Sequence, residues 1–154
     1  LFNNAYGIAP NTLGSELLES TLNNLENTYP HINQILKEKV IKVEKQDDVF
    51  HVTTNKNNYT TKMIVVATNS SNAFNIEGLM EYVIPHQKSL ASKNRIQLKN
   101  IDHKVTDNIY VAGTLAGWRS QLSIASGSGA AVATDILVKW NNGIETHAHD
   151  SVKK

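Results

Sequence analysis

Apolar residues recur at two different spacings along the chain, and the change of spacing separates the predicted elements. From Leu13 to Tyr29 they recur every three or four positions, which is typical of one face of an α-helix. Asn11 or Thr12 is a suitable N-cap, and Pro30 ends the segment. We therefore expect an amphipathic helix in this part of the chain.

A β pattern follows the helix. Short apolar segments separated by polar turns predict strands at residues 40–45, 49–54 and 59–62. Because the turns are short, these strands should form an antiparallel meander. The next segment, residues 63–67, is apolar without alternation, which is typical of a strand buried on both faces of a parallel sheet.

The pattern is weaker in the rest of the chain, apart from one strand and one helix. Two short strands are predicted at residues 79–84 and 95–99. A buried strand is predicted at residues 109–112, followed by a glycine turn and a helix from about Ser120 to Trp140. Trp140 fits the apolar stripe of that helix, so we expect it in the core. The order of elements favours an α/β fold.

Composition narrows the classes of protein that the chain could be. It has 154 residues, of which 40% are hydrophobic and 19% charged, as in a soluble globular domain. The net charge of +1 gives no electrostatic reason to expect nucleic acid or an anionic membrane as a partner. The longest apolar run, residues 63–67, is too short to cross a membrane, and no signal peptide is visible, so we expect a cytoplasmic protein.

Cysteine and histidine usage argues against metal and thiol chemistry. The 154 residues include no cysteine, which excludes a disulfide, a thiolate metal site and a redox dithiol within them. His147 and His149 lie in a polar tail with no other ligand nearby in sequence, so no metal site is predicted.

The stretch from Asn108 to Ala131 carries most of the chemical information, because it describes a strand, a turn at Gly113 and the start of a helix. Glycine lets the backbone turn tightly and lets a ligand approach the main chain. The start of a helix presents unpaired N–H groups and a positive partial charge, which suit a phosphate or a reduced flavin. The same pattern also fits an ordinary strand-to-helix connection, and the residues alone leave both interpretations open.

Two stretches resemble landmarks of the flavin-dependent disulfide-reductase superfamily, the group that includes thioredoxin reductase. Asn108 to Ala131 is similar to the second flavin-binding motif, a strand ending in Ala-Gly-Asp before a helix of small residues. Tyr59 to Thr68 resembles the strand that ends in Ala-Thr-Gly after the family's β-meander. The whole chain resembles short bacterial flavoproteins of the pyridine nucleotide-disulfide oxidoreductase type.

This resemblance implies a fold and a cofactor. Residues 1–143 would form an FAD-binding-type domain, an FAD/NAD(P)-binding Rossmann-like three-layer domain with an antiparallel β-meander, and residues 144–154 would be a polar C-terminal tail. Near the flavin's ribityl and phosphate region, Thr114 takes the position of the family's Asp after Gly113, and its hydroxyl can still donate a hydrogen bond. The backbone of Gln121 and Leu122 would face the pyrimidine edge of the flavin.

The resemblance also implies contacts away from the flavin ring. Val40 matches the position whose backbone brackets the adenine, and Ala67 and Thr68 would pass close to the pyrophosphate and ribose. Asn69 stands where the family has Gly. Arg119 would either pair with a phosphate or lie at the surface.

Parts of the larger enzymes are missing from this sequence. The stretch between Asn69 and Gly113 is too short for a nicotinamide-binding domain. The string Gly127-Ser-Gly129 lies inside the predicted helix and therefore does not form a phosphate loop. The chain begins without methionine, and we hypothesise that about 40–60 further residues upstream supply the first strand, the phosphate loop and its helix.

The sequence thus predicts a small FAD-linked oxidoreductase with a single flavin domain, which we expect to be a homodimer. Reducing equivalents would come from a redox partner protein or from NAD(P)H bound without a dedicated domain. No catalytic acid, base or nucleophile can be identified, although His86 and His103 lie in loops that could approach a flavin. Trp118 could cover a ring face, or pack in the core or an interface. The alternative is a non-catalytic flavin- or nucleotide-binding module, or an interaction protein, derived from the same fold.

Overall fold

The computed structural model describes residues 1–146, and these divide into two compact units. The first comprises Leu1–Lys39 and the second begins at Val40. His147, His149 and most of the predicted tail lie outside the described residues. Each unit is considered by itself below.

The first unit contains the predicted helix, α1 (Gly14–Thr28). The carboxylate of Glu16 accepts a hydrogen bond from the backbone N–H of Leu13, at 3.2 Å, and so caps the first turn. The expectation that Asn11 or Thr12 is the N-cap is therefore wrong, because Leu13 occupies that position. No side chain of α1 is fully buried.

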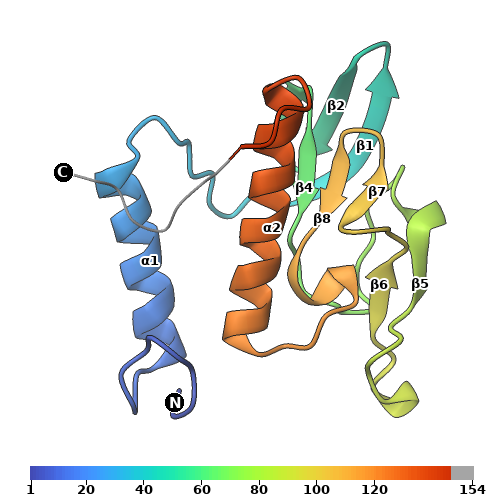
Figure 1. The fold of residues 1–154 in the computed structure, drawn as a ribbon. Helices are drawn as coiled ribbons and strands as arrows, with labels where there is room; N and C mark the ends of the chain where they lie inside the picture. The colour runs from blue at the N-terminus through green and yellow to red at the C-terminus, as the bar shows by residue number, and fades with distance from the viewer. Residues whose placement is uncertain (147–154) are drawn as a thin grey trace. The chain divides into compact units, whose positions relative to one another are not determined.

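The second unit begins with the predicted meander (Figure 1). Strands β1 (Val40–Gln46), β2 (Val49–Thr54) and β3 (Asn58–Thr61) form an antiparallel sheet in the order β1-β2-β3. Asp47 adopts a positive φ of 53° in the turn between β1 and β2, a conformation that Asp tolerates better than most residues.

A second sheet brings the two landmark strands together. Strand β4 (Ile64–Val66) pairs in parallel with β8 (Ile109–Val111), and β7 (Lys104–Thr106) pairs antiparallel with the other edge of β8. Because β4 and β8 are parallel and in register, their C-terminal ends lie side by side. The residues that follow the two strands therefore leave the sheet together, at what is called below the shared edge of β4 and β8. Strand β7 was not predicted, since only one apolar residue marks its three positions.

The remaining elements are short, except for α2. Strands β5 (Val83–Pro85) and β6 (Ile96–Leu98) pair antiparallel, and their loop contains the 3-10 helix η2 (Ala91–Lys93). The predicted strand at residues 79–84 is wrong in its first half, which forms the 3-10 helix η1 (Met80–Tyr82). The 3-10 helix η3 (Gly113–Ala116) follows β8, and the long helix is α2 (Leu122–Trp140).

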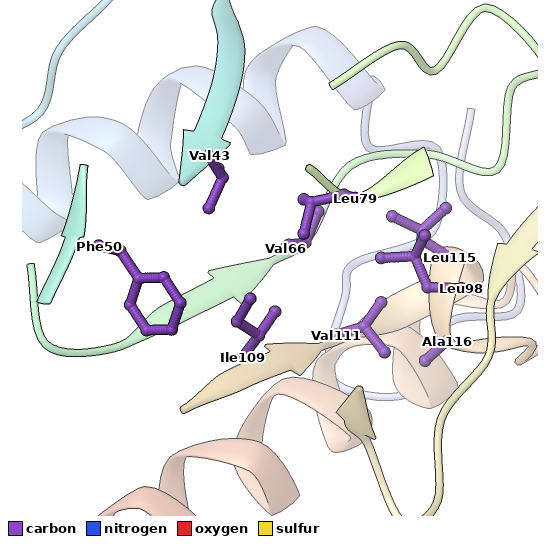
Figure 2. Close-up of a cluster of buried hydrophobic side chains, with 9 residues drawn as sticks. All are labelled: Val43, Phe50, Val66, Leu79, Leu98, Ile109, Val111, Leu115 and Ala116. Carbon is purple, nitrogen blue, oxygen red and sulfur yellow. The ribbon is translucent and has the colours of Figure 1, made fainter. Parts of the chain in front are cut away.

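The central sheet has a different hydrophobic cluster on each face, because side chains alternate along β8. Tyr110, and Ala112 just after the strand, pack with Val132 of α2. The opposite face of β8 joins the main core, whose buried residues come from all three sheets, η3 and the turn before η1 (Figure 2). These residues are Val43, Phe50, Val66, Leu79, Leu98, Ile109, Val111, Leu115 and Ala116.

Helix α2 is buried only near its middle, at Ser128 and Val132. Trp140 is 68% exposed, so the prediction that it belongs to the core is wrong. It occupies the last position of the helix, two turns beyond Val132.

Candidate cofactor site at the start of helix α2

The turn after β8 is shaped by two glycines with different roles. Gly113 has a φ of +70° and Gly117 a φ of +88°, values that residues with a side chain rarely adopt. A Cβ on Gly117 would lie 2.8 Å from Oε1 of Gln97, so the Gln97 amide would have to shift to make room for it. Among the described residues, apart from its two chain neighbours, nothing lies within 4 Å of where a Cβ on Gly113 would be. The backbone at Gly113 is therefore open to a ligand.

A buried hydroxyl fixes this turn to α2. The backbone N–H of Gly113 donates to Oγ of Ser128, at 2.9 Å, and Ser128 is 7% exposed. The same Oγ lies 2.9 Å from Nε2 of His103. The indole N–H of Trp118 donates to that nitrogen, at 3.0 Å. Since an indole can only donate, Nε2 accepts, and the ring proton of His103 is assigned to Nδ1.

A second histidine connects the β5–β6 loop to the turn. Nε2 of His86 lies 3.2 Å from the carbonyl oxygen of Thr114, and Nδ1 of His86 accepts the backbone N–H of Lys88 at 3.1 Å. Nε2 therefore donates, and both ring nitrogens are engaged with backbone groups. In this arrangement His86 positions the loop and has no proton free for a ligand.

The start of α2 opens on a pocket of about 430 Å³. Three parts of the second unit form its wall: Asn69 and Ser70 after β4, the β5–β6 loop, and the segment from Thr114 to Gln121. The α2 N-cap, Gln121, lies in this wall, so the first turn of the helix begins at the pocket. Helix α2 begins two residues later than the predicted Ser120.

The charge of the pocket wall is positive. Four cationic residues line it, and no Asp or Glu does; the cations are Lys88, Lys93, Arg95 and Arg119. The ammonium of Lys88 lies 4.0 Å from the centroid of the Trp118 ring. Within residues 1–146, none of the four forms a salt bridge. Such a wall favours an anionic ligand.

The structure brings most of the predicted cofactor residues to this region. Thr114, Arg119 and Gln121 line the pocket. Gly113 and Leu122 are each adjacent in sequence to one of these residues. Whether any of them contacts FAD stays a prediction.

The predicted contacts on β4 and β1 lie differently. Ala67 and Thr68 are exposed, directly follow β4, and precede Asn69 of the pocket wall. Val40 begins β1, where it packs against the main core and does not line the pocket. The structure thus brings together the residues that follow β4 and β8, whereas Val40 is not part of the pocket wall.

Sequence reasoning missed the cations of the β5–β6 loop and the network around His103. The sequence did contain a signal for the cations of this loop, because no acidic residue occurs between Glu81 and Asp102, while several basic residues do. The network around His103 had no local signal, since the hydrogen-bond partners of His103 lie 15 and 25 positions away in sequence.

Across residues 1–146, no group of three or more His, Asp or Glu side chains could hold a metal ion. In the same part of the chain, no helix has the length and apolar character to cross a membrane.

Comparisons with known proteins give one family and one fold. The family model described as pyridine nucleotide-disulphide oxidoreductase matches residues 4–114. No curated protein is significantly similar in sequence. Two solved structures of a ferredoxin-flavin thioredoxin reductase from Clostridium acetobutylicum are similar in fold. One has a TM-score of 0.62 at 16% identity, over 92% of this chain and 83% of that chain. The other has a TM-score of 0.66 at 14% identity, over 92% and 84%.

Proposed function

Because the chain belongs to the pyridine nucleotide-disulphide oxidoreductase family, we propose that it is an FAD-linked oxidoreductase related to thioredoxin reductase. It would act through a single flavin domain, without a nicotinamide-binding domain or a redox dithiol of its own. The observation that carries this proposal is the open backbone at Gly113 beside a cationic pocket at the start of α2.

The residues around the turn suit the flavin part of FAD. The Thr114 hydroxyl can hydrogen-bond a ribityl oxygen, and the open backbone at Gly113 permits close approach. The first N–H groups of α2, near Gln121 and Leu122, have no partner within the helix and can donate to the pyrimidine edge. A positive helix end and Arg119 favour the negative charge of a reduced flavin. When bound, FAD would supply the electron transfer.

The dinucleotide end of FAD would follow the shared edge of β4 and β8. Ala67 and Thr68 are exposed there and free to pass the pyrophosphate and ribose. Val40 would bracket the adenine through its backbone. This assignment places the flavin in the pocket, whose volume of about 430 Å³ lies within the ordinary range for small-molecule sites.

Reducing equivalents would reach the flavin from a partner protein. The two similar solved structures are named for ferredoxin and thioredoxin, and we extend the idea of protein redox partners to this chain. NAD(P)H bound without its own domain is the other possible donor. The chain would work as a cytoplasmic homodimer with a three-layer FAD/NAD(P)-binding domain over residues 1–143.

The test is the visible spectrum of the purified protein, followed by titration with FAD. We expect flavin absorption bands and saturable quenching of FAD fluorescence. Anaerobic bleaching by NADH or NADPH would identify a nicotinamide donor, and bleaching only by a reduced protein would identify a partner. A protein that binds FAD but cannot be reduced by either would instead be a non-catalytic binding module. Failure to bind FAD would contradict the proposal.

A further inference from the structure

We propose that His103 is a positioning residue of the candidate cofactor site, and that a proton taken up by its ring releases Trp118 from the pocket wall. The hydrogen bonds that carry this proposal lie within the chain, so the release of Trp118 does not require that flavin be bound. Only the effect of that release on FAD rests on the proposed function.

The side chain of His103 joins segments that lie far apart in sequence. Its Nε2 lies 3.0 Å from the indole nitrogen of Trp118 and 2.9 Å from Oγ of Ser128. The rings of His103 and Trp118 also stack, with their centroids 6.0 Å apart. Since Oγ of Ser128 accepts the N–H of Gly113, His103 connects the glycine turn to an aromatic ring of the pocket wall.

The two partners of Nε2 respond differently to a proton on the ring. The indole N–H can only donate, so the neutral ring accepts there, and the hydroxyl of Ser128 donates to the same nitrogen. A hydroxyl rotates, and Ser128 can therefore accept a hydrogen bond from a protonated Nε2 instead. The indole cannot, because a protonated Nε2 would place two N–H donors 3.0 Å apart. Uptake of a proton thus breaks the bond to Trp118 and preserves the contact with Ser128.

The backbone holds His103 in place, in a conformation that costs energy. Asp102 and His103 have φ values of 47° and 68°, in a tight turn just before β7. Turns with two positive φ values usually contain Asn and Gly. The N–H of His103 donates to Oδ1 of Asn100 at 3.2 Å, and its carbonyl oxygen accepts the N–H of Val111 at 2.9 Å. Because the histidine is fixed in this way, the side chain that moves when the shared hydrogen bond breaks is Trp118.

Trp118 borders two cavities, so its release changes both. Its side chain is 40% exposed and lines the candidate cofactor pocket. It also lines a smaller cavity of about 180 Å³, which His103 shares. The ammonium of Lys88 lies 4.0 Å from the centroid of its ring. Loss of the indole hydrogen bond therefore alters the wall of the cofactor pocket and removes the support of Lys88.

Charged groups near the His103 ring act on its protonation in both directions. Asp102 and Lys88 line the smaller cavity with it, and the carboxylate attracts positive charge on the ring whereas the ammonium repels it. Lys104, the next residue, forms a salt bridge, and the contact from α2 is an uncharged hydroxyl. Arg119 lines the cofactor pocket and not the smaller cavity. Histidine is the side chain that most readily changes charge between about pH 5 and 8, so the release should follow ordinary changes in pH.

Signals from Trp118 test the release directly. In a Trp140→Phe variant, Trp118 is the only tryptophan, because the chain has two. From about pH 8 to about pH 5 we expect its indole N–H proton resonance to move upfield as the hydrogen bond is lost, and acrylamide to quench its emission more strongly. At the basic end, nitrogen NMR of His103 should show the proton on Nδ1 and none on Nε2. An indole signal that stays constant, or a proton on Nε2 at the basic end, would overturn the proposal.

A matched pair of substitutions separates His103 from the other histidines. His103→Gln keeps an acceptor for the indole but takes up no proton in this range, so the transition should disappear with Trp118 still held. His51→Gln removes a histidine of the meander that lines neither cavity, and the transition should remain. A transition that persists in His103→Gln, or disappears in His51→Gln, would refute the role of His103. Far-ultraviolet circular dichroism checks that each variant is folded at both ends of the pH range. If His103→Gln is unfolded, the NMR signals of the Trp140→Phe protein still decide.

Titration with FAD at the two ends of the pH range tests the link to the cofactor site. With His103 in place, the affinity for FAD should fall about five- to tenfold on acidification, as expected when one hydrogen bond that shapes a site is lost. In His103→Gln it should change much less. Equal changes in the two proteins would refute the positioning role. Since the NMR measurements need no flavin, failure of FAD binding would leave the release of Trp118 standing, and absence of the release would leave flavin binding standing.

Discussion

At the scale of single residues, Gly113 and Ser128 determine how the turn after β8 is built. Gly113 leaves open the space that a Cβ would fill, and Ser128 of α2, which is buried, accepts a hydrogen bond from its N–H. The hydroxyl of Ser128 also contacts His103, which in turn accepts from Trp118. One buried serine therefore couples the turn to the pocket wall.

Replacing Gly113 with alanine should separate backbone strain from loss of ligand contact. Gly143→Ala is a matched control, because Gly143 also has a positive φ, +81°, and an open surrounding. Both variants should lose about 1 kcal/mol of unfolding free energy, the usual cost of alanine at positive φ. Only Gly113→Ala should raise the Kd for FAD, by about tenfold or more, in a fluorescence titration. Equal FAD affinities in the two variants would contradict the proposed position of the flavin.

Removal of the Ser128 hydroxyl should leave the Gly113 N–H without its partner. Ser128→Ala should lower the free energy of unfolding by about 1–3 kcal/mol, measured by urea denaturation, because a buried donor loses its acceptor. Ser126→Ala is the control, since its hydroxyl is exposed and bonds only to backbone within α2. A loss as large in Ser126→Ala would show that helix propensity, and not the contact with Gly113, explains the effect.

Individual residues were predictable where local chemistry identifies them. The strand-to-turn pattern identified Gly113, whereas Thr114 and Gln121 were named through the resemblance to a known family, and these two line the pocket. The partners of His103 are brought to it only by the pairing of β7 with β8 and the packing of α2. Those contacts are set by the tertiary structure, so no window of sequence contains them.

At the scale of elements, α2 is tied to the sheet at both its middle and its end. Val132 packs on Tyr110 of β8. In the last turn, the ammonium of Lys139 donates to the carboxylate of Asp107 in the β7–β8 turn, at 2.9 Å. Lys104 lies 3.5 Å from the same carboxylate oxygen. The helix that begins at the pocket is thereby aligned with the central sheet.

The Asp107 carboxylate should make stability depend on pH in the acidic range. The hydrogen bond from Lys139, and then its charge, lower the pKa of Asp107 in the folded protein. A lowered folded pKa stabilises the protein above the unfolded pKa, near 4, and this contribution is lost as the pH falls through the folded pKa. Asp107→Asn should therefore lower the urea midpoint slightly at pH 7 and leave it unchanged at the acidic end.

The size of this effect should be small, because the pair is exposed and screened by salt. Asp48→Asn, in the exposed turn between β1 and β2, is the control for removing an exposed carboxylate. A difference between Asp107→Asn and the unmodified protein that grows on acidification would contradict the assigned role of Lys139.

Elements were predictable in proportion to the length and regularity of their apolar pattern. The meander, β4, β8 and both helices have several apolar positions each, and all were predicted within a few residues. Strand β7 is as short as β4 and β8, but only one of its three residues is apolar, whereas every residue of β4 and β8 is. The 3-10 helix η1 has three residues, too few for any periodicity. Leu79 was read as part of a strand because it is apolar. It is fully buried, but in a turn, where Gly78 lies against the backbone of Val43.

At the scale of the whole molecule, the α/β class follows from the order of the elements, but the positions of the strands do not. The parallel pairing of β4 with β8 joins segments separated by the whole β5–β6 hairpin and β7. That pairing creates the shared edge at which Thr68 and Gly113 emerge. The apolar pattern of residues 63–67 predicted a strand of a parallel sheet, but it did not identify β8 as the partner of that strand.

If the shared edge of β4 and β8 binds FAD, ligand binding must also stabilise the folded state. Binding to the native state alone adds about 2.7 kcal/mol when free ligand is at 100 times its Kd. For a chain of 154 residues this corresponds to a rise in Tm of roughly 5–10 °C. Differential scanning fluorimetry with increasing FAD should show this shift. Riboflavin, which lacks the phosphates and the adenine, should give a smaller one at the same concentration, because it forgoes the proposed contacts at Ala67 and Thr68. Equal shifts would place all of the binding energy on the flavin ring, and the absence of any shift with FAD would argue against a flavoprotein.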